Sequence, residues 1–273
     1  MSDFELVHIR NKDLVFPIDK TYIPEGEMKI RNLILNLFSD PNSKDDMDYY
    51  LLAEAVFWSI GELINNANKA NNRWAILHNA LFQKIKNEYP DLNENHLKEE
   101  IDESIEHNQV DLLKKYGLEN IDLTASILNL IEKYKTNSFA LSEKFNKKIT
   151  LTMKIQKKND VDYLIVNVIN NSPITVIDKQ RVEYNLNKIK EDLINANTNP
   201  FEAALKLYQK EADTAGGGFG AGLRSIVLFL KSGFDPFDVE IVFTKLIQYR
   251  SAGKNTIFSI EIPIPKKKKL TKV

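Results

Sequence analysis

The chain has 273 residues, of which 43% are hydrophobic and 27% charged, a balance typical of globular proteins and not of disordered or fibrous ones. With 37 Lys and Arg residues against 38 Asp and Glu residues, no global charge favours nucleic acid or an anionic membrane. The absence of cysteine excludes disulfides, thiol catalysis and zinc–thiolate sites.

The beginning of the chain, "MSDFELVHIRNKD", lacks the basic start and the apolar run of a signal peptide. No apolar stretch reaches the length of about 18 residues that a membrane-spanning helix needs. We therefore expect a cytoplasmic protein that neither enters a membrane nor binds nucleic acid.

Two alternating segments, "FELVHIR" and "DLVFPI", predict a short hairpin or two edge strands, and "MKIRNLILNLF" predicts a short helix. We assign these elements to an N-terminal section, residues 1–45. A long helix follows from Met47 to about Glu88, because the stretch has no proline and its apolar residues recur at helical spacing. Asp45 and Asp46 are candidate N-caps.

Residues 89–148 read as a charged helical insertion, in which Gly117 is a candidate helix terminator. The segments "KITLTMKIQKK" and "VDYLIVNVIN" then predict an antiparallel hairpin around a polar turn. Further helical patterns lead to a last predicted hairpin, "FDVEIVFTKLIQYR" and "TIFSIEIPIP". Helices combined with hairpins, and not with repeated βα units, indicate an α+β sandwich.

A glycine cluster in "DTAGGGFGAGLRSIVLFLK", Asp213 to Lys231, runs directly into a helical pattern. The dinucleotide motif is rejected because the cluster does not follow a buried strand, and the P-loop motif because Gly222 is followed by Leu223 and Arg224. Two alternatives stay open: a phosphate-binding loop at a helix N-terminus, or a flexible turn without a ligand.

A second group of polar residues interrupts the long helix. Glu62, Asn66, Lys69 and Arg73 are spaced by four, three and four residues and therefore share one helix face, which we call the polar strip. A carboxylate, an amide oxygen and an ammonium group in this order could orient a water, complete a magnesium shell and neutralise phosphate. The alternative is a solvated face with an i,i+4 ion pair.

Together the two groups resemble the ATP-binding domain shared by gyrase, the ninety-kilodalton heat-shock chaperones, mismatch-repair ATPases and sensor histidine kinases (GHKL, the Bergerat fold). The family's N box, E-x-x-x-N-A-x-K, is matched by Glu62, Asn66, Ala67 and Lys69. In "GKNTIFSIEIP", Thr256 resembles the family's threonine in a terminal strand. The second glycine box is matched by Gly217, Gly218, Gly220, Gly222, Leu223, Ile226 and Val227.

The resemblance implies a two-layer α/β sandwich over residues 46–273, with a mixed, mostly antiparallel sheet and helices on one face. It implies that Glu62 is the general base, that Asn66 holds Mg²⁺ and that Lys69 faces the phosphates of ATP. The remaining nucleotide-binding residues would be Asn170, Thr256, Gly217, Gly218, Gly220, Gly222 and Leu223.

The family's first glycine box is altered in this chain. In "VINNSPIT", Asn170 stands where an aspartate normally accepts a hydrogen bond from adenine, and Ser172 and Ile174 replace two glycines. An asparagine both donates and accepts, which leaves base selectivity open. Three alternatives follow, in this order: ordinary ATP binding, an altered base preference, or a pocket that has lost nucleotide binding.

None of the four histidines, His8, His78, His96 and His107, matches the phosphoacceptor motif of histidine kinases, so we expect them to be surface or packing residues. The resemblance therefore favours a signalling protein that uses Mg·ATP to phosphorylate a partner protein, as anti-sigma serine kinases do, or to drive a switch. The alternative is a non-catalytic interaction module that uses the insertion to recruit partners. The oligomeric state is open, with a homodimer among the alternatives.

Overall fold

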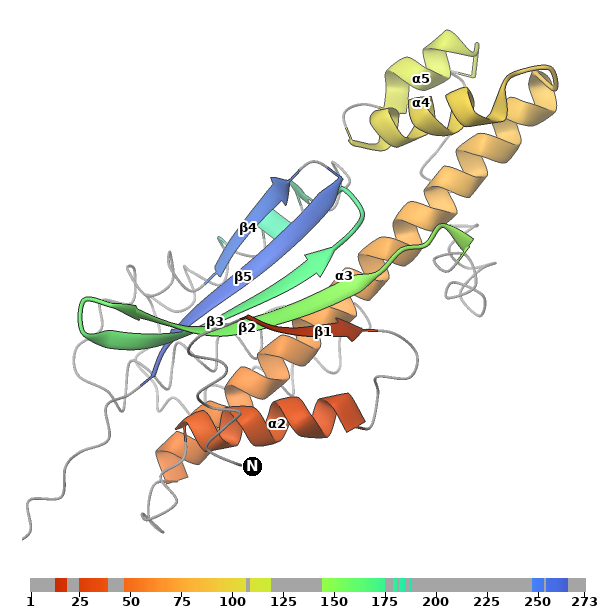
Figure 1. Cartoon of the computed structure of the whole chain (residues 1–273). Coiled ribbons are helices and arrows are strands. Elements are labelled where there is room, and N and C mark those ends of the chain that lie inside the picture. Colours follow the sequence, from red (N-terminus) through yellow and green to blue (C-terminus); the bar gives the residue numbers. More distant parts are fainter. Residues whose placement is uncertain are drawn as a thin grey trace, which may run out of the picture.

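A computed structural model describes residues 13–18, 25–38, 47–106, 109–118, 144–174, 179–180, 182–184, 187, 247–252 and 254–264. In chain order, its main elements are β1 (Leu14–Ile18), α2 (Glu25–Phe38), α3 (Met47–Glu88), α4 (Glu94–Glu106), α5 (Gln109–Lys115), β2 (Ile149–Lys158), β3 (Val161–Asn170), β4 (Ile247–Ala252) and β5 (Asn255–Pro263). Figure 1 shows the sheet beside the first half of α3, with α4 and α5 at the far end of this helix.

The five described strands form one sheet in the order β1-β2-β3-β5-β4, and every described pairing is antiparallel. The mixed sheet that the resemblance implies is therefore not seen among these strands, whereas the predicted α+β class is confirmed. The first predicted hairpin is present as β2–β3. The second corresponds to β4–β5, although residues 237–246 of its predicted first arm lie outside the described residues. The predicted strand "DLVFPI" is β1, which pairs with β2 at the edge of the sheet.

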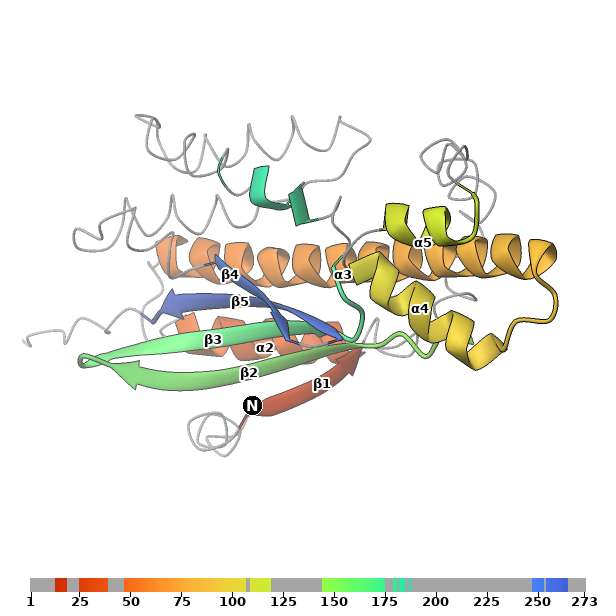
Figure 2. The ribbon, with the colours of Figure 1, turned by 90° about the horizontal axis from the view of Figure 1, so that it is seen from above.

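Alternation along the strands gives the sheet one apolar face, and α2 and α3 cover it (Figure 2). Leu164, Val166 and Val168 of β3 point to this face and are at most 1% exposed. They pack with buried residues of β2, β5, α2 and α3, which we call the sheet core. An ion pair at 2.7 Å between Arg31 of α2 and Glu54 of α3 adds a polar contact between the two helices.

The turn between β2 and β3 is specified locally. Lys158 pairs with Val161, so the loop consists of only Asn159 and Asp160, and both residues have positive φ, 47° and 63°. A two-residue loop with two positive φ angles is the type I′ hairpin, which asparagine and aspartate tolerate better than most residues. This turn fixes the register between β2 and β3, in which Asn170 at the end of β3 lies opposite Ile149 at the start of β2.

The second half of α3 packs with α4 and α5 in a separate apolar cluster, the helical core, which includes Trp74, Leu81, Ile101 and Leu113. Asn93 caps α4, because its side-chain oxygen accepts hydrogen bonds from the backbone of Asn95 and His96. Gly117 ends α5 with φ 63° and with the paired backbone bonds of a Schellman motif, which confirms its predicted role.

Several predicted elements fall outside the described residues: the strand "FELVHIR", the caps Asp45 and Asp46, the helix "ASILNLIEKYK", and the region from 188 to 246 with its glycine cluster. Among the described helices, none is both long enough and apolar enough to cross a membrane.

The sheet core supplies a direct test of the fold. Val166→Ala removes two methyl groups from a fully buried position on the central strand, so we expect the free energy of unfolding to fall by about 2–3 kcal/mol. Val15→Ala is the matched control, because Val15 is 59% exposed on edge strand β1 and should lose less than about 0.5 kcal/mol. Urea denaturation measures both values, and equal losses would contradict this assignment of the core.

Candidate functional site

The apolar face of the sheet ends in polar residues. On β3 the buried positions Leu164, Val166 and Val168 are followed at the same spacing by Asn170, which is only 4% exposed. Asn170 lies directly opposite Thr256 of β5, and Thr256 is also 4% exposed. The period of two residues therefore turns both polar side chains towards the helix layer, where apolar residues are expected.

Asn170 joins the central strand to α3. Its side-chain Nδ2 donates a hydrogen bond of 3.3 Å to the backbone carbonyl of Ala67, the residue that follows Asn66. Because a carbonyl only accepts, the amide nitrogen faces the helix and Oδ1 points elsewhere. That oxygen is buried and has no hydrogen-bond partner among the described residues. Buried polar atoms almost always have a partner, so Oδ1 marks a place where a donor is missing.

Ser172 and Thr256 extend the polar contact. The Ser172 hydroxyl donates to Oδ1 of Asn71 at 2.6 Å, and the Thr256 hydroxyl donates to the carbonyl of Ser172 at 2.8 Å. All three residues are buried. We call Asn71, Asn170, Ser172 and Thr256 the polar cluster; it ties β3, β5 and the segment after β3 to one turn of α3.

The polar strip borders this cluster on α3. Glu62, Asn66 and Arg73 are half-buried and Lys69 is exposed. Glu62, Asn66 and Arg73 each directly precede a buried residue, and Lys69 lies two positions before one. The strip therefore follows the edge of the buried face of the helix. The strip thus runs along α3 past Ala67, the residue that is hydrogen-bonded to Asn170 at the end of β3.

The predicted site residues fall into two groups. Asn170 is hydrogen-bonded to Ala67, the residue after Asn66, and lies opposite Thr256. On the same helix, Glu62 lies four residues before Asn66 and Lys69 three residues after it. Gly217, Gly218, Gly220, Gly222 and Leu223 lie outside the described residues. In the described part of the chain, no cluster of three or more His, Asp or Glu side chains is suited to a metal ion.

Asn71 is a site residue that the sequence analysis missed. It lies one turn after Ala67, is 2% exposed, and accepts the hydrogen bond of Ser172. The signal was present in "NNANKANN", where an amide at a buried helical position needs a polar partner. The partner is 101 residues away in the sequence, so the helix alone could not identify it.

The two described histidines are a surface residue and a packing residue, as the sequence analysis expects. His96 is exposed, whereas His78 is 2% exposed and packs its ring against Trp74 and Phe145, with centroids 4.8 and 4.7 Å apart. Burial lowers the pKa of His78 from 6.5 to about 4. A hydrogen bond with the Lys98 backbone acts in the opposite direction but has the smaller effect. His78 is therefore neutral at pH 7, and its contact of 3.5 Å with Asp102 is not an ion pair at that pH.

No protein-family model matches the chain, and neither the curated proteins nor the solved structures contain a significant match.

Asn170→Asp tests the tie between β3 and α3. An aspartate would lose the donor to Ala67 and place a carboxylate oxygen against a carbonyl oxygen, so we expect the free energy of unfolding to fall by about 1–3 kcal/mol. Asn167→Asp is the matched control on the same strand, because its partners Thr152 and Ser259 are hydroxyls that can donate to a carboxylate. Denaturation curves that shift equally for both variants would contradict the proposed role of Asn170.

His78 predicts a specific acid sensitivity. The unfolded chain binds a proton at this residue below about pH 6.5, whereas the folded chain does so only below about pH 4. The free energy of unfolding therefore decreases by about 3 kcal/mol as the pH is lowered from about 6.5 to about 4. Burial raises the pKa of Asp102, which offsets part of this loss at the acidic end. Urea denaturation at about pH 7 and about pH 4.5 measures this loss. We expect the free energy of unfolding to decrease less between these pH values for His78→Phe than for the wild type. His96→Gln, at an exposed position, should behave as the wild type does.

Proposed function

We propose that this chain is a GHKL-type nucleotide-binding protein that uses Mg·ATP to phosphorylate a partner protein or to drive a conformational switch. The observation that carries the proposal is the buried Oδ1 of Asn170, which has no partner among the described residues. Asn170 lies opposite Thr256 and is hydrogen-bonded through Nδ2 to Ala67, the residue after Asn66. Three segments that carry the family's motifs therefore converge, although 103 residues separate Ala67 from Asn170.

The orientation of Asn170 supports adenine as the base. Its Nδ2 is engaged by the Ala67 carbonyl, so the group left for a ligand is an acceptor. The exocyclic amino group of adenine is a donor, whereas guanine presents a carbonyl oxygen at the corresponding position, which would face another acceptor. Asn170 can thus act as the family's aspartate does without carrying its charge, which favours ordinary ATP binding over an altered base preference.

The polar strip supplies the chemistry at the phosphate end. Mg²⁺ prefers oxygen ligands and commonly takes one or two from the protein and others from phosphate, and the side-chain oxygen of Asn66 fits this role. Lys69 is exposed and would neutralise phosphate charge. Glu62 would orient the attacking hydroxyl or water and accept its proton. Bound Mg·ATP would contribute a polarised phosphoryl group as the electrophile.

The second candidate is a non-catalytic interaction module built on the same fold. It is favoured by the internal hydrogen bonds of Ser172 and Thr256, which are satisfied within the protein and need no ligand. In this case the polar cluster only ties the sheet to α3, and a water satisfies Asn170.

Titration calorimetry separates the candidates. We expect Mg·ATP to bind more tightly than Mg·GTP, and Asn66→Ala and Lys69→Ala each to weaken ATP binding by about tenfold or more, equivalent to about 1.4 kcal/mol. Asn65→Ala is the matched control, because Asn65 is an exposed amide next to the strip. Glu62→Gln should retain binding and lose turnover.

Three results would contradict this proposal. If no nucleotide binds at millimolar concentration, the interaction module is favoured. If ATP and GTP bind equally, Asn170 does not read the base. If Glu62→Gln leaves turnover unchanged, another group activates the nucleophile.

A further inference from the structure

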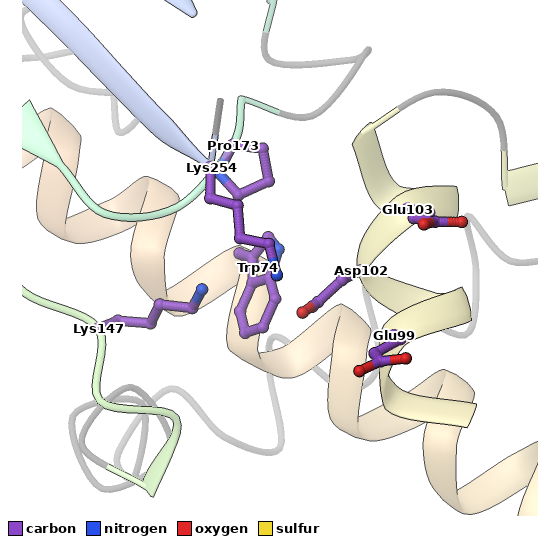
Figure 3. Close-up of a pocket in the computed structure, with 7 residues that line it drawn as sticks. All are labelled: Trp74, Glu99, Asp102, Glu103, Lys147, Pro173 and Lys254. Carbon is purple, nitrogen blue, oxygen red and sulfur yellow. The ribbon is translucent and has the colours of Figure 1, made fainter. Parts of the chain in front are cut away.

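A cavity of about 220 Å³ lies between α3, α4 and the end of the sheet, at the junction of the sheet core and the helical core. Figure 3 shows Trp74 of α3 at its centre, with Lys147 on one side and Asp102 of α4 pointing towards it from the other. The cavity is smaller than the range of about 300–1,000 Å³ usual for drug-sized ligands, so an occupant would be small.

Charges of opposite sign line the two sides of the cavity. Lys147, before β2, and Lys254, between β4 and β5, supply cations from the sheet side, and Glu99, Asp102 and Glu103 supply carboxylates from α4. Both lysines influence the pKa of Asp102, so the two sides are electrostatically close. Among the described residues, however, no ion pair joins them.

Two buried polar atoms at the cavity also lack partners. The indole Nε1 of Trp74, a residue only 3% exposed, is a donor without an acceptor among the described residues. Oδ1 of Asp102 likewise accepts no hydrogen bond among them, and it lies 3.5 Å from Nε2 of the neutral His78. The two lysines on the sheet side and the three carboxylates of α4 are complementary in charge. A ligand with a negative group and a positive group would match the charges on the two sides of the cavity.

We propose that this cavity binds a small zwitterion of the α-amino-acid class, with its carboxylate towards Lys147, Lys254 and Trp74 and its ammonium group towards the carboxylates of α4. The cavity adjoins the polar cluster, because Pro173 follows Ser172 in the sequence, but none of its lining residues belongs to the polar cluster or to the polar strip. Its binding does not require nucleotide.

Lys147 is held in place for this role. Its Nζ lies 3.4 Å from the centre of the Trp74 ring and 3.5 Å from the carbonyl oxygen of Asn171. Burial lowers the pKa of Lys147 to about 8, and Lys254 contributes to the shift while Asp102 opposes it. The ammonium form therefore predominates at pH 7, and the ring face favours the same charged form. Affinity for the carboxylate should fall as the pH rises above about 8.

Tryptophan fluorescence gives a direct assay. The chain has two tryptophans, so Trp58→Phe, at a half-exposed position of α3, leaves Trp74 as the only reporter. The twenty common amino acids are titrated one at a time in the absence of nucleotide, beside butylamine and butyrate as ligands with one charge only. We expect saturable emission changes with at least one amino acid, and affinities for the single-charge compounds that are weaker by about tenfold or more.

Variants on each side then test the placement. Lys254→Gln and Glu103→Gln remove one charge from each side without changing length greatly, and each should weaken binding by about tenfold. Lys154→Gln, on β2 and away from the cavity, is the control and should bind as the parent does. Circular dichroism confirms that each variant is folded.

The proposal is overturned if no amino acid gives a saturable change at millimolar concentration and ligand-observed NMR also detects no binding. It is equally overturned if butylamine or butyrate binds as tightly as the amino acid, or if Lys254→Gln and Glu103→Gln bind unchanged. Failure of ATP to bind in calorimetry leaves these outcomes unaffected, so the two proposals are tested separately.

Discussion

Burial of one face of α3 is the constraint on which the other described elements depend. The first half of this face closes the sheet core and the second half forms the helical core with α4 and α5. Because this face is committed to packing along most of the helix, accessible polar groups lie at its edges or on the opposite side of the helix. The polar strip follows such an edge, and the polar cluster lies where the buried face passes the end of β3.

The polar cluster places hydrogen-bonding groups in the buried layer between the sheet and α3. Asn170, Ser172 and Thr256 occupy buried positions where apolar residues would pack without a hydrogen-bonding requirement. Most of their polar atoms are satisfied within the protein, and the exception, Oδ1 of Asn170, leaves a local cost that a ligand or water can offset. Departures from local folding rules of this kind are expected at functional positions.

Local patterns predicted most of the described fold. The bounds of α3, the two hairpins and the end of α5 at Gly117 follow from spacing, polar turns and a residue that tolerates positive φ. The pairing of Asn71 with Ser172, and the cavity that brings Lys147 and Lys254 to α4, could not be predicted in this way. Both depend on contacts between distant segments, for which a single sequence carries no periodic signal. The roles of the glycine cluster and the strip, by contrast, stem from a family resemblance and stay predictions.

The 42 residues of α3 have a mechanical consequence. At about 1.5 Å per residue the helix is a rod of about 63 Å, and both hydrophobic cores are attached to it. A small tilt of the rod at the sheet becomes a larger sideways movement of α4 and α5, in proportion to their distance from the pivot. Because one continuous helix joins the two cores, such a tilt displaces α4 and α5 without refolding of the intervening helix.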